Sequence, residues 1–334
     1  MVETHSAAPE AAREIPVTEI AGIRIGQTEN EAAGTGCTVF LNENGMRAGL
    51  DVRGGGPASR ESELLKPLAA ADVIHAVVLA GGSAYGLDAA GGVMELLEER
   101  GYGLDVGVAK VPLVVQSDLF DLTVGDVSVR PDKAMGREAA RRALEEPNYR
   151  DGNYGAGCGA TVGKTLGMDT GMKTGIGSFA LQIGDLQVGA VVALNALGDV
   201  IDPESGRQIA GLLTEDRKGL RSTSEIMKVM SLPGWNAFAA NTTLAVVITN
   251  ARFEKPQLCK IAGMAHDGYA RSIRPVHTSM DGDSIYAVSV GEVVSNMDLV
   301  GTLAAEVISG AILRAVESAD GAYGFPSARD LGLI

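Results

Sequence analysis

Four short runs of small and β-branched apolar residues place the strongest constraint on how this chain can fold. The runs read IHAVVLA, VGAVVALNA, TLAVVIT and SIYAVSV, and they occupy residues 74–80, 188–196, 243–249 and 284–290. Continuous apolar runs of this length, rich in valine and isoleucine, are typical of buried β-strands. The sequence therefore predicts sheets whose faces must be covered by other elements.

Three helical stretches are interspersed with these runs. Residues 86–100 stop at Gly101 and place four apolar residues on one face, namely Leu87, Ala90, Met94 and Leu97. Residues 131–146 open with Pro-Asp, a helix-start signal, and residues 301–319 form a long, mostly apolar segment that we expect in the core. This mixture of strands and helices predicts one layered domain in which helices cover sheets.

Composition and patterning set the domain organisation. The 334 residues include 44 glycines and only 4% aromatic residues, so the interior must use Ala, Val, Leu and Ile, with many tight turns. Residues 1–16 are expected to form a loose tail, and residues 17–334 a single domain without linker or repeat. Residues 203–236 carry scattered charge and no clear strand. They form either a surface excursion or a segment that leaves the peptide bond after Asn241 flexible and accessible.

The formal charge of −14 argues against two classes of partner. Such a balance repels phosphate backbones and anionic lipids, so we expect neither nucleic acid nor a membrane surface as a partner. No apolar window is expected to reach the length of a membrane span. Cys37, Cys158 and Cys259 are widely spaced and the N-terminus does not read as a signal peptide, so the expected location is the cytoplasm.

The glycine-rich segment GAGCGATVGKTLG, residues 155–167, ends like a phosphate-binding loop. That pattern needs a glycine where this chain has Cys158, and it needs a buried strand where this chain has a polar, turn-like stretch. We therefore do not predict a nucleotide site, and Lys164 needs another role. No metal-type spacing of cysteine or histidine appears, and Asp281 and Asp283 do not follow the EF-hand order, so no metal or organic cofactor is expected.

Asn241, Thr242 and Thr243 form a small polar turn directly before a run of β-branched residues. One interpretation is a turn that feeds a strand. The other is a self-cleaving junction, in which the Thr242 hydroxyl attacks the carbonyl of Asn241 and water then releases the upstream chain. Thr242 would be left with a free α-amine, whose ordinary pKa of about 7.7–8.0 lets it accept the hydroxyl proton near neutral pH.

Four further residues have side chains suited to assist such a nucleophile. Asp281 and Asp283 are two residues apart on an extended segment, so their carboxylates face the same way about 7 Å apart. They form either a solvated turn or a pair that grips an ammonium group and orients a hydroxyl. Lys164 would offset their charge. Asn195 ends an apolar strand, either as a turn former or as an N–H donor to an oxyanion.

Histidine and cysteine make weaker candidates. His5 lies in the predicted tail, His75 lies within a strand, and His266 and His277 are interpreted as structural. Cys158 has no base that the sequence makes visible.

Taken together, these segments resemble the L-aminopeptidase/D-esterase family, peptidase family S58, which includes β-aminopeptidases and nylon-oligomer (6-aminohexanoate-oligomer) hydrolases. The similarity runs from about Val17 to about Ala319. The segments that carry it are DVRGGGPASRESELL (51–65), AGGSAYGLDAAGG (80–92), RPDKAMGREAARRA (130–143), GNYGAGCGATVGK (152–164), NTTLAVVITNA (241–251) and HTSMDGDSIYAV (277–288).

The resemblance implies an α+β fold, a four-layer αββα sandwich of the N-terminal-nucleophile type. It also implies cleavage between Asn241 and Thr242 into chains 1–241 and 242–334 that stay associated, with a homo-oligomer of these processed pairs. Thr242 matches the family nucleophile. The other catalytic positions of the nylon-hydrolase branch fall on Lys164, Asn195, Asp281 and Asp283.

The resemblance also suggests where substrate binds, and one segment departs from it. Gly82, Ser83 and Tyr85 are expected to contact substrate. Around residues 115–122 relatives carry an apolar run, whereas this chain has Asp118 there and Phe120 in place of a tyrosine. We expect Asp118 to recognise a substrate ammonium and Phe120 to line the site without a phenol donor.

Three functions are consistent with the sequence. The first is a self-processing amidohydrolase or aminopeptidase that acts on small peptides or ω-amino amides through an acyl-enzyme on Thr242. The second is acyl transfer to an amine, as in the similarly folded ornithine acetyltransferases. The third is a non-catalytic, glycine-rich binding protein.

Overall fold

We describe a computed structural model of the chain, which covers residues 11–229 and 241–334. Its central feature is β3 (Thr35–Val52), an 18-residue strand that takes part in two sheets. In sheet A, residues 47–52 of β3 pair with β17 (Ser284–Val293), and the order continues through β15 (Leu244–Ala251), β12 (Leu186–Ala193), β11 (Ile176–Ile183) and β1 (Arg13–Ile15). In sheet B, the first part of β3 pairs with β2 (Arg24–Asn30) and β5 (Ile74–Ala80), followed by β8 (Val114–Asp118) and β4 (Ala58–Arg60).

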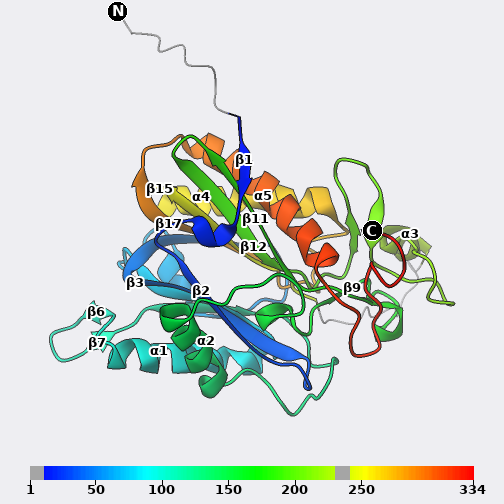
Figure 1. Cartoon of the computed structure of the whole chain (residues 1–334), viewed down its shortest axis with the longest axis horizontal. Helices are drawn as coiled ribbons and strands as arrows, with labels where there is room; N and C mark the ends of the chain where they lie inside the picture. The colour runs from blue at the N-terminus through cyan, green and yellow to red at the C-terminus, as the bar shows by residue number, and fades with distance from the viewer. Residues whose placement is uncertain (1–10, 230–240) are drawn as a thin grey trace, which may run out of the picture.

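Helices cover the outer faces of both sheets. Helices α4 (Lys255–Ser272) and α5 (Met297–Glu317) pack on sheet A, and α1 (Ala89–Glu99) and α2 (Lys133–Glu145) pack on sheet B. In Figure 1 these two helix pairs lie above and below the strands. Three apolar cores separate the layers, one between the sheets and one under each helix pair. The predicted αββα arrangement is confirmed.

The remaining elements are short and lie in the connections. The strands are β6 (Leu104–Asp105), β7 (Lys110–Val111), β9 (Thr161–Val162), β10 (Met172–Lys173), β13 (Asp199–Ile201), β14 (Gln208–Ala210) and β16 (Ile273–Arg274). The helical turns are η1 (Val17–Glu19), η2 (Ser62–Leu65), η3 (Ser83–Asp88), η4 (Gly155–Gly157), η5 (Met168–Thr170) and the helix α3 (Thr223–Val229).

The predicted elements are present, with shifted ends. The run at residues 74–80 coincides with β5, and the other three runs lie within a few residues of β12, β15 and β17. Helix α2 begins after Asp132, whose side chain accepts the N–H of Met135. Helix α1 begins only at Ala89, because residues 83–88 form a 3₁₀ turn, and α5 begins at Met297 after an Asn296 cap.

Two predictions about irregular segments are wrong. Residues 1–16 are not loose throughout, because Arg13–Ile15 pair with β11 and the side chain of Ile15 is buried between the sheets; residues 1–10 lie outside the described part. Within residues 203–236, β14 and α3 are ordered elements. Asp199 anchors this segment by accepting the N–H groups of Leu212 and Thr223. Residues 230–240 lie outside the description.

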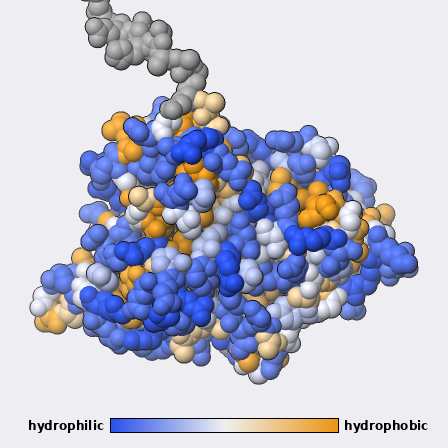
Figure 2. Space-filling view, in the orientation of Figure 1, coloured by the Kyte–Doolittle hydropathy of each residue, from blue (hydrophilic) through white to orange (hydrophobic). Residues whose placement is uncertain are grey.

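Helix α5 is long and apolar enough to cross a membrane by length and composition, contrary to our expectation that no segment is. In the structure 67% of its apolar window is buried, against α4 and sheet A, as a core helix requires. The face in Figure 2 is mostly hydrophilic, with small separate hydrophobic patches. The expectation that residues 301–319 lie in the core is therefore confirmed.

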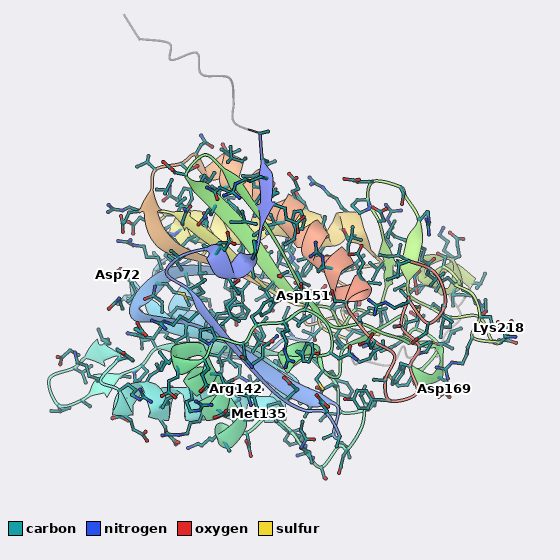
Figure 3. All side chains as sticks on the ribbon, viewed as in Figure 1. Asp72, Met135, Arg142, Asp151, Asp169 and Lys218 are labelled. Atoms are coloured by element: carbon teal, nitrogen blue, oxygen red, sulfur yellow. The ribbon has the colours of Figure 1, made fainter. Side chains whose placement is uncertain are left out.

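Glycines allow the helices to approach the sheets closely. A Cβ on Gly26 of β2 would lie 2.1 Å from the carbonyl oxygen of Ala139 in α2, and one on Gly177 of β11 would lie 2.2 Å from the nitrogen of Ala315 in α5. On the sheet B side, Arg142 of α2, labelled in Figure 3, donates to the carbonyl of Gln27 in β2 at 2.9 Å. The high glycine and low aromatic content thus corresponds to closely spaced layers.

Two glycines of α4 provide a test of this packing. A Cβ on Gly268 would lie 2.4 Å from the carbonyl oxygen of Ala305 in α5, whereas one on Gly263 would find no heavy atom nearer than 3.4 Å. We expect Gly268→Ala to lower the free energy of unfolding by about 1–3 kcal/mol through overpacking. Gly263→Ala should raise it by about 0.5–1 kcal/mol through helix propensity. Urea titrations of both variants measure the two effects, and equal changes would contradict the close helix crossing.

Candidate active site

The predicted catalytic residues meet because several strand ends share one edge of sheet A. Strands β15 and β17 are parallel, so Thr242 and Asp283, each just before its strand, lie at the same edge. Strand β12 is antiparallel to β15, so Asn195, just after β12, lies there too. The register pairs Leu244 with Ser284 and Ala193 with Leu244, which brings these three segments together.

The Asn241–Thr242 junction is buried. Asn241 is 3% exposed and Thr242 is 4% exposed, so the prediction that the preceding segment leaves this bond accessible is wrong. The hydroxyl of Thr242 donates to the carbonyl oxygen of Asn241 at 2.5 Å, and the N–H of Gly282 donates to the same oxygen at 3.0 Å. The N–H of Thr242 donates to the backbone carbonyl of Asn195 at 2.7 Å.

Both aspartates are buried and hydrogen-bonded. Asp283 accepts the N–H of Thr243 through Oδ1 at 2.9 Å, and its Oδ2 accepts from Nδ1 of His277 at 2.9 Å. Asp281 accepts the hydroxyl of Thr278 at 2.6 Å. Burial, and then the charge of Asp283, raises the pKa of Asp281 to about 6. The pair is therefore a constrained part of the site, which excludes the interpretation as a solvated turn.

Lys164 lies within this site and is 1% exposed. Its Nζ donates to Oδ1 of Asn195 at 2.7 Å. Burial lowers the pKa of Lys164 to about 7, and the charges of Asp281 and Asp121 oppose that shift. Lys164 thus lies near Asp281, one of the two predicted carboxylates, while the second carboxylate that acts on it is Asp121 rather than Asp283.

Asn195 makes two kinds of contact, one through its side chain and one through its backbone. The side-chain oxygen accepts from Lys164, and the side-chain nitrogen donates to the carbonyl of Phe120 at 3.0 Å. The backbone carbonyl holds the nitrogen of Thr242. The role of the Asn195 amide as an oxyanion donor stays a prediction.

Asp121 is a buried residue of the site that the sequence reasoning missed. Its Oδ2 accepts the hydroxyl of Thr35 and its Oδ1 accepts the N–H of Gly82, both at 2.7 Å. Burial raises the pKa of Asp121 to about 6, and Lys164 opposes the shift. The signal that could have identified it is its position directly after Phe120, in the sequence Phe-Asp-Leu at residues 120–122.

The predicted substrate residues gather around η3 and the end of β8. Gly82 and Ser83 both adopt left-handed backbone conformations, with φ of 82° and 52°. Tyr85 is 62% exposed, and the guanidinium of Arg130 lies 4.1 Å from its ring centroid. Asp118 is buried, and burial raises its pKa well above the usual range. Its contact with a substrate ammonium stays a prediction, and it would require ionising a carboxyl that burial favours as the neutral acid.

The alternative nucleophiles fit structural roles. Cys158 is buried and its Sγ lies 3.4 Å from the hydroxyl of Tyr323; burial raises the pKa of this thiol, which disfavours the reactive thiolate. His75 is buried and accepts the N–H of Leu113 at 3.1 Å. His277, by contrast, contacts the catalytic-site carboxylate of Asp283. His5 lies outside the described residues.

Sequence comparison identifies the family. A profile of peptidase family S58 matches residues 16–329. The chain belongs to this family. It is 35% identical over 341 residues to an uncharacterized aminopeptidase of Mycobacterium leprae, covering 93% of this chain and 92% of the relative. It is 32% identical over 321 residues to a 6-aminohexanoate-oligomer endohydrolase of Paenarthrobacter ureafaciens, covering 91% and 86%.

Structural comparison agrees with the S58 assignment. The L-aminopeptidase D-Ala-esterase/amidase of Ochrobactrum anthropi, described as a variant of the Ntn hydrolase fold, superposes with a TM-score of 0.71 at 17% identity and covers 97% of this chain and 94% of that chain. The N-terminal-nucleophile fold is therefore confirmed. Together with the family match, it identifies the protein as an amide hydrolase, and the prediction of a non-catalytic binding protein is wrong.

Proposed function

We propose that this S58 hydrolase cuts itself between Asn241 and Thr242 and then hydrolyses amide bonds through an acyl-enzyme on Thr242. The observation that carries the proposal is the position of the Thr242 hydroxyl, 2.5 Å from the carbonyl oxygen of the peptide bond that it would cut. A buried hydroxyl next to a fixed carbonyl has the proximity that intramolecular attack requires.

The proposed self-cleavage is an N-to-O acyl shift followed by hydrolysis. Oγ of Thr242 attacks the carbonyl carbon of Asn241, the C–N bond breaks, and the hydroxyl proton ends on the released nitrogen. Water then hydrolyses the ester, leaving a carboxylate on Asn241 and a free α-amine on Thr242. That amine can serve as the base for later turnovers.

The surrounding side chains fit supporting roles in this reaction. Asp283 fixes the backbone of Thr243, next to the nucleophile, and Asp281 lies in the same loop. Lys164 supplies a positive charge near Asp281 and holds the side chain of Asn195. These contacts fix the residues around Thr242, and the proposed chemistry uses only a hydroxyl, an amine and oriented dipoles.

The proposed substrates are small peptides and ω-amino amides, including 6-aminohexanoate oligomers. The proposal follows from the relatives, which are named as aminopeptidases and as a 6-aminohexanoate-oligomer endohydrolase. We further propose that the enzyme works in the cytoplasm as a homo-oligomer of processed pairs, with hydrolysis preferred over acyl transfer.

Intact-mass analysis of the purified protein tests the cleavage. We expect two polypeptides, residues 1–241 and 242–334, with threonine at the N-terminus of the smaller one. The same preparation, assayed on dipeptides, β-amino amides and 6-aminohexanoate oligomers, reports the substrate class. An active preparation that consists of one uninterrupted chain would refute the proposal.

A further inference from the structure

Three hydrogen bonds hold the peptide bond between Asn241 and Thr242, two at its carbonyl oxygen and one at its nitrogen. Its carbonyl oxygen accepts the N–H of Gly282 at 3.0 Å, and the Thr242 hydroxyl donates to the same oxygen. Its nitrogen donates to the backbone carbonyl of Asn195 at 2.7 Å. The electrophile, the nucleophile and the leaving group are thus all fixed before any bond breaks.

Gly282 reaches this carbonyl because it carries no side chain. A Cβ at this position would lie 2.5 Å from Oγ1 of Thr242 and 3.0 Å from the carbonyl oxygen of Gly56. The φ of Gly282 is not among the left-handed values, so its backbone conformation alone does not require glycine. What requires glycine here is the space taken by the Thr242 hydroxyl.

The loop that carries Gly282 is fixed on both sides. The carbonyl of Asp281 accepts the N–H of Gly56 at 2.9 Å, and the carbonyl of Asp283 accepts the N–H of Arg53 at 3.0 Å. The side chain of Asp283 also holds the N–H of Thr243. The N–H of Gly282 therefore does not need to move to meet a charge that develops on the oxygen of Asn241.

We propose that the backbone N–H of Gly282 is the oxyanion donor for self-cleavage. The inference rests on the proposed attack by Thr242. When Oγ bonds to the carbonyl carbon, the π electrons move to the Asn241 oxygen, and the Gly282 N–H stabilises that negative charge. When the oxyanion collapses, the C–N bond breaks, an ester links Asn241 to Oγ of Thr242, and the nitrogen keeps the proton from the hydroxyl.

The same donor serves the second step of self-cleavage. In the ester, the carbonyl of Asn241 remains attached to Thr242, so its oxygen stays within reach of the same N–H. Attack by water places a negative charge on that oxygen again. Loss of this one donor therefore slows both steps.

An amide-to-ester replacement at position 282 tests the donor directly. Cell-free translation with glycolic acid in place of Gly282 exchanges the N–H for an oxygen and adds no side chain. We expect self-cleavage to slow by about 10²- to 10³-fold, the usual effect of losing one oxyanion donor. Glycolic acid at Gly56 is the matched control, since it removes a donor to the same loop but none to Asn241; there we expect less than a tenfold change.

The outcomes separate this inference from the proposed function. If Thr242→Val still splits at the same bond, the nucleophile assignment fails. If Thr242→Val stays whole while the position-282 ester cleaves within about threefold of the parent, only the oxyanion assignment fails. Amide hydrogen exchange on uncut Thr242→Val gives an independent measurement: the Gly282 N–H should be strongly protected, and rapid exchange would overturn the assignment even if the ester does not fold.

Discussion

Thr242→Val is expected to remain a single chain and to lose hydrolytic activity by roughly 10⁴-fold or more, as happens when a catalytic nucleophile is removed. Valine has nearly the same shape as threonine, so the substitution deletes the hydroxyl and leaves the buried packing intact. The Thr242 N–H can still donate to Asn195. Gel electrophoresis and intact mass report cleavage, and amide hydrolysis reports turnover.

Thr243 offers a matched control at the next position. Its side chain is also buried, but its hydroxyl has no hydrogen-bond partner among the described residues, 11–229 and 241–334. Thr243→Val should therefore cleave at the parental rate, with unchanged or slightly higher stability because it removes an unsatisfied polar atom. Thr242→Ser, which keeps a hydroxyl, should still cleave. A Thr243→Val chain that stays whole while Thr242→Val cleaves would reverse the assignment.

Lys164→Met is expected to slow self-cleavage by about 10²-fold or more while the chain still folds. The substitution removes the positive charge near Asp281 and Asp121 and the donor that orients Asn195. It also removes a buried charge whose pKa is lowered from 10.5 to about 7, mainly by burial. The substitution should therefore lower the cleavage rate, while it also removes the cost of burying this charge from the free energy of unfolding.

The pH dependence of stability follows from the sign of that shift. Between about pH 7 and 10.5 the unfolded chain holds a proton on Lys164 that the folded chain lacks, so this residue makes stability rise with pH. The free-energy cost of burying the charged Lys164 side chain is full below pH 7 and disappears as pH approaches 10.5. Thermal unfolding measures the stability of Lys164→Met relative to the parent. The substitution should increase stability more, or decrease it less, at pH 6 than at pH 9.5. A pH-independent difference would contradict the lowered pKa.

Lys173 is the matched control for this prediction. It is equally buried, and its pKa is also lowered to about 7, but its Nζ donates to the carbonyls of Gly157, Ala160 and Thr174 and not to Asn195. Lys173→Met should lower stability, because it leaves these carbonyls with one donor fewer, and should change the cleavage rate by less than tenfold. Equal losses of cleavage in both variants would make the role of Lys164 structural.

The glycine-rich segment, residues 155–167, shows most clearly the difference between what the sequence predicts and what the fold adds. The sequence excluded a phosphate-binding loop because Cys158 replaces a required glycine, and this left the role of Lys164 to be explained in another way. In the structure its partners are Asn195, Asp281 and Asp121, which come from three distant segments. No local pattern around Lys164 encodes those contacts, so the sequence did not point to Asp121.

Apolar periodicity, caps and turn residues act over a few neighbouring positions, so they predicted strands β5, β12, β15 and β17, helices α1, α2 and α5, and a polar turn at Thr242. They did not predict that this turn is buried, that the side chain of Asn195 faces Phe120, or that the Gly282 N–H meets the carbonyl of Asn241, because these contacts depend on tertiary packing. The physical reason is that parallel pairing of β15 and β17 brings together segments about forty residues apart, and strand register is set by the packing of whole sheets.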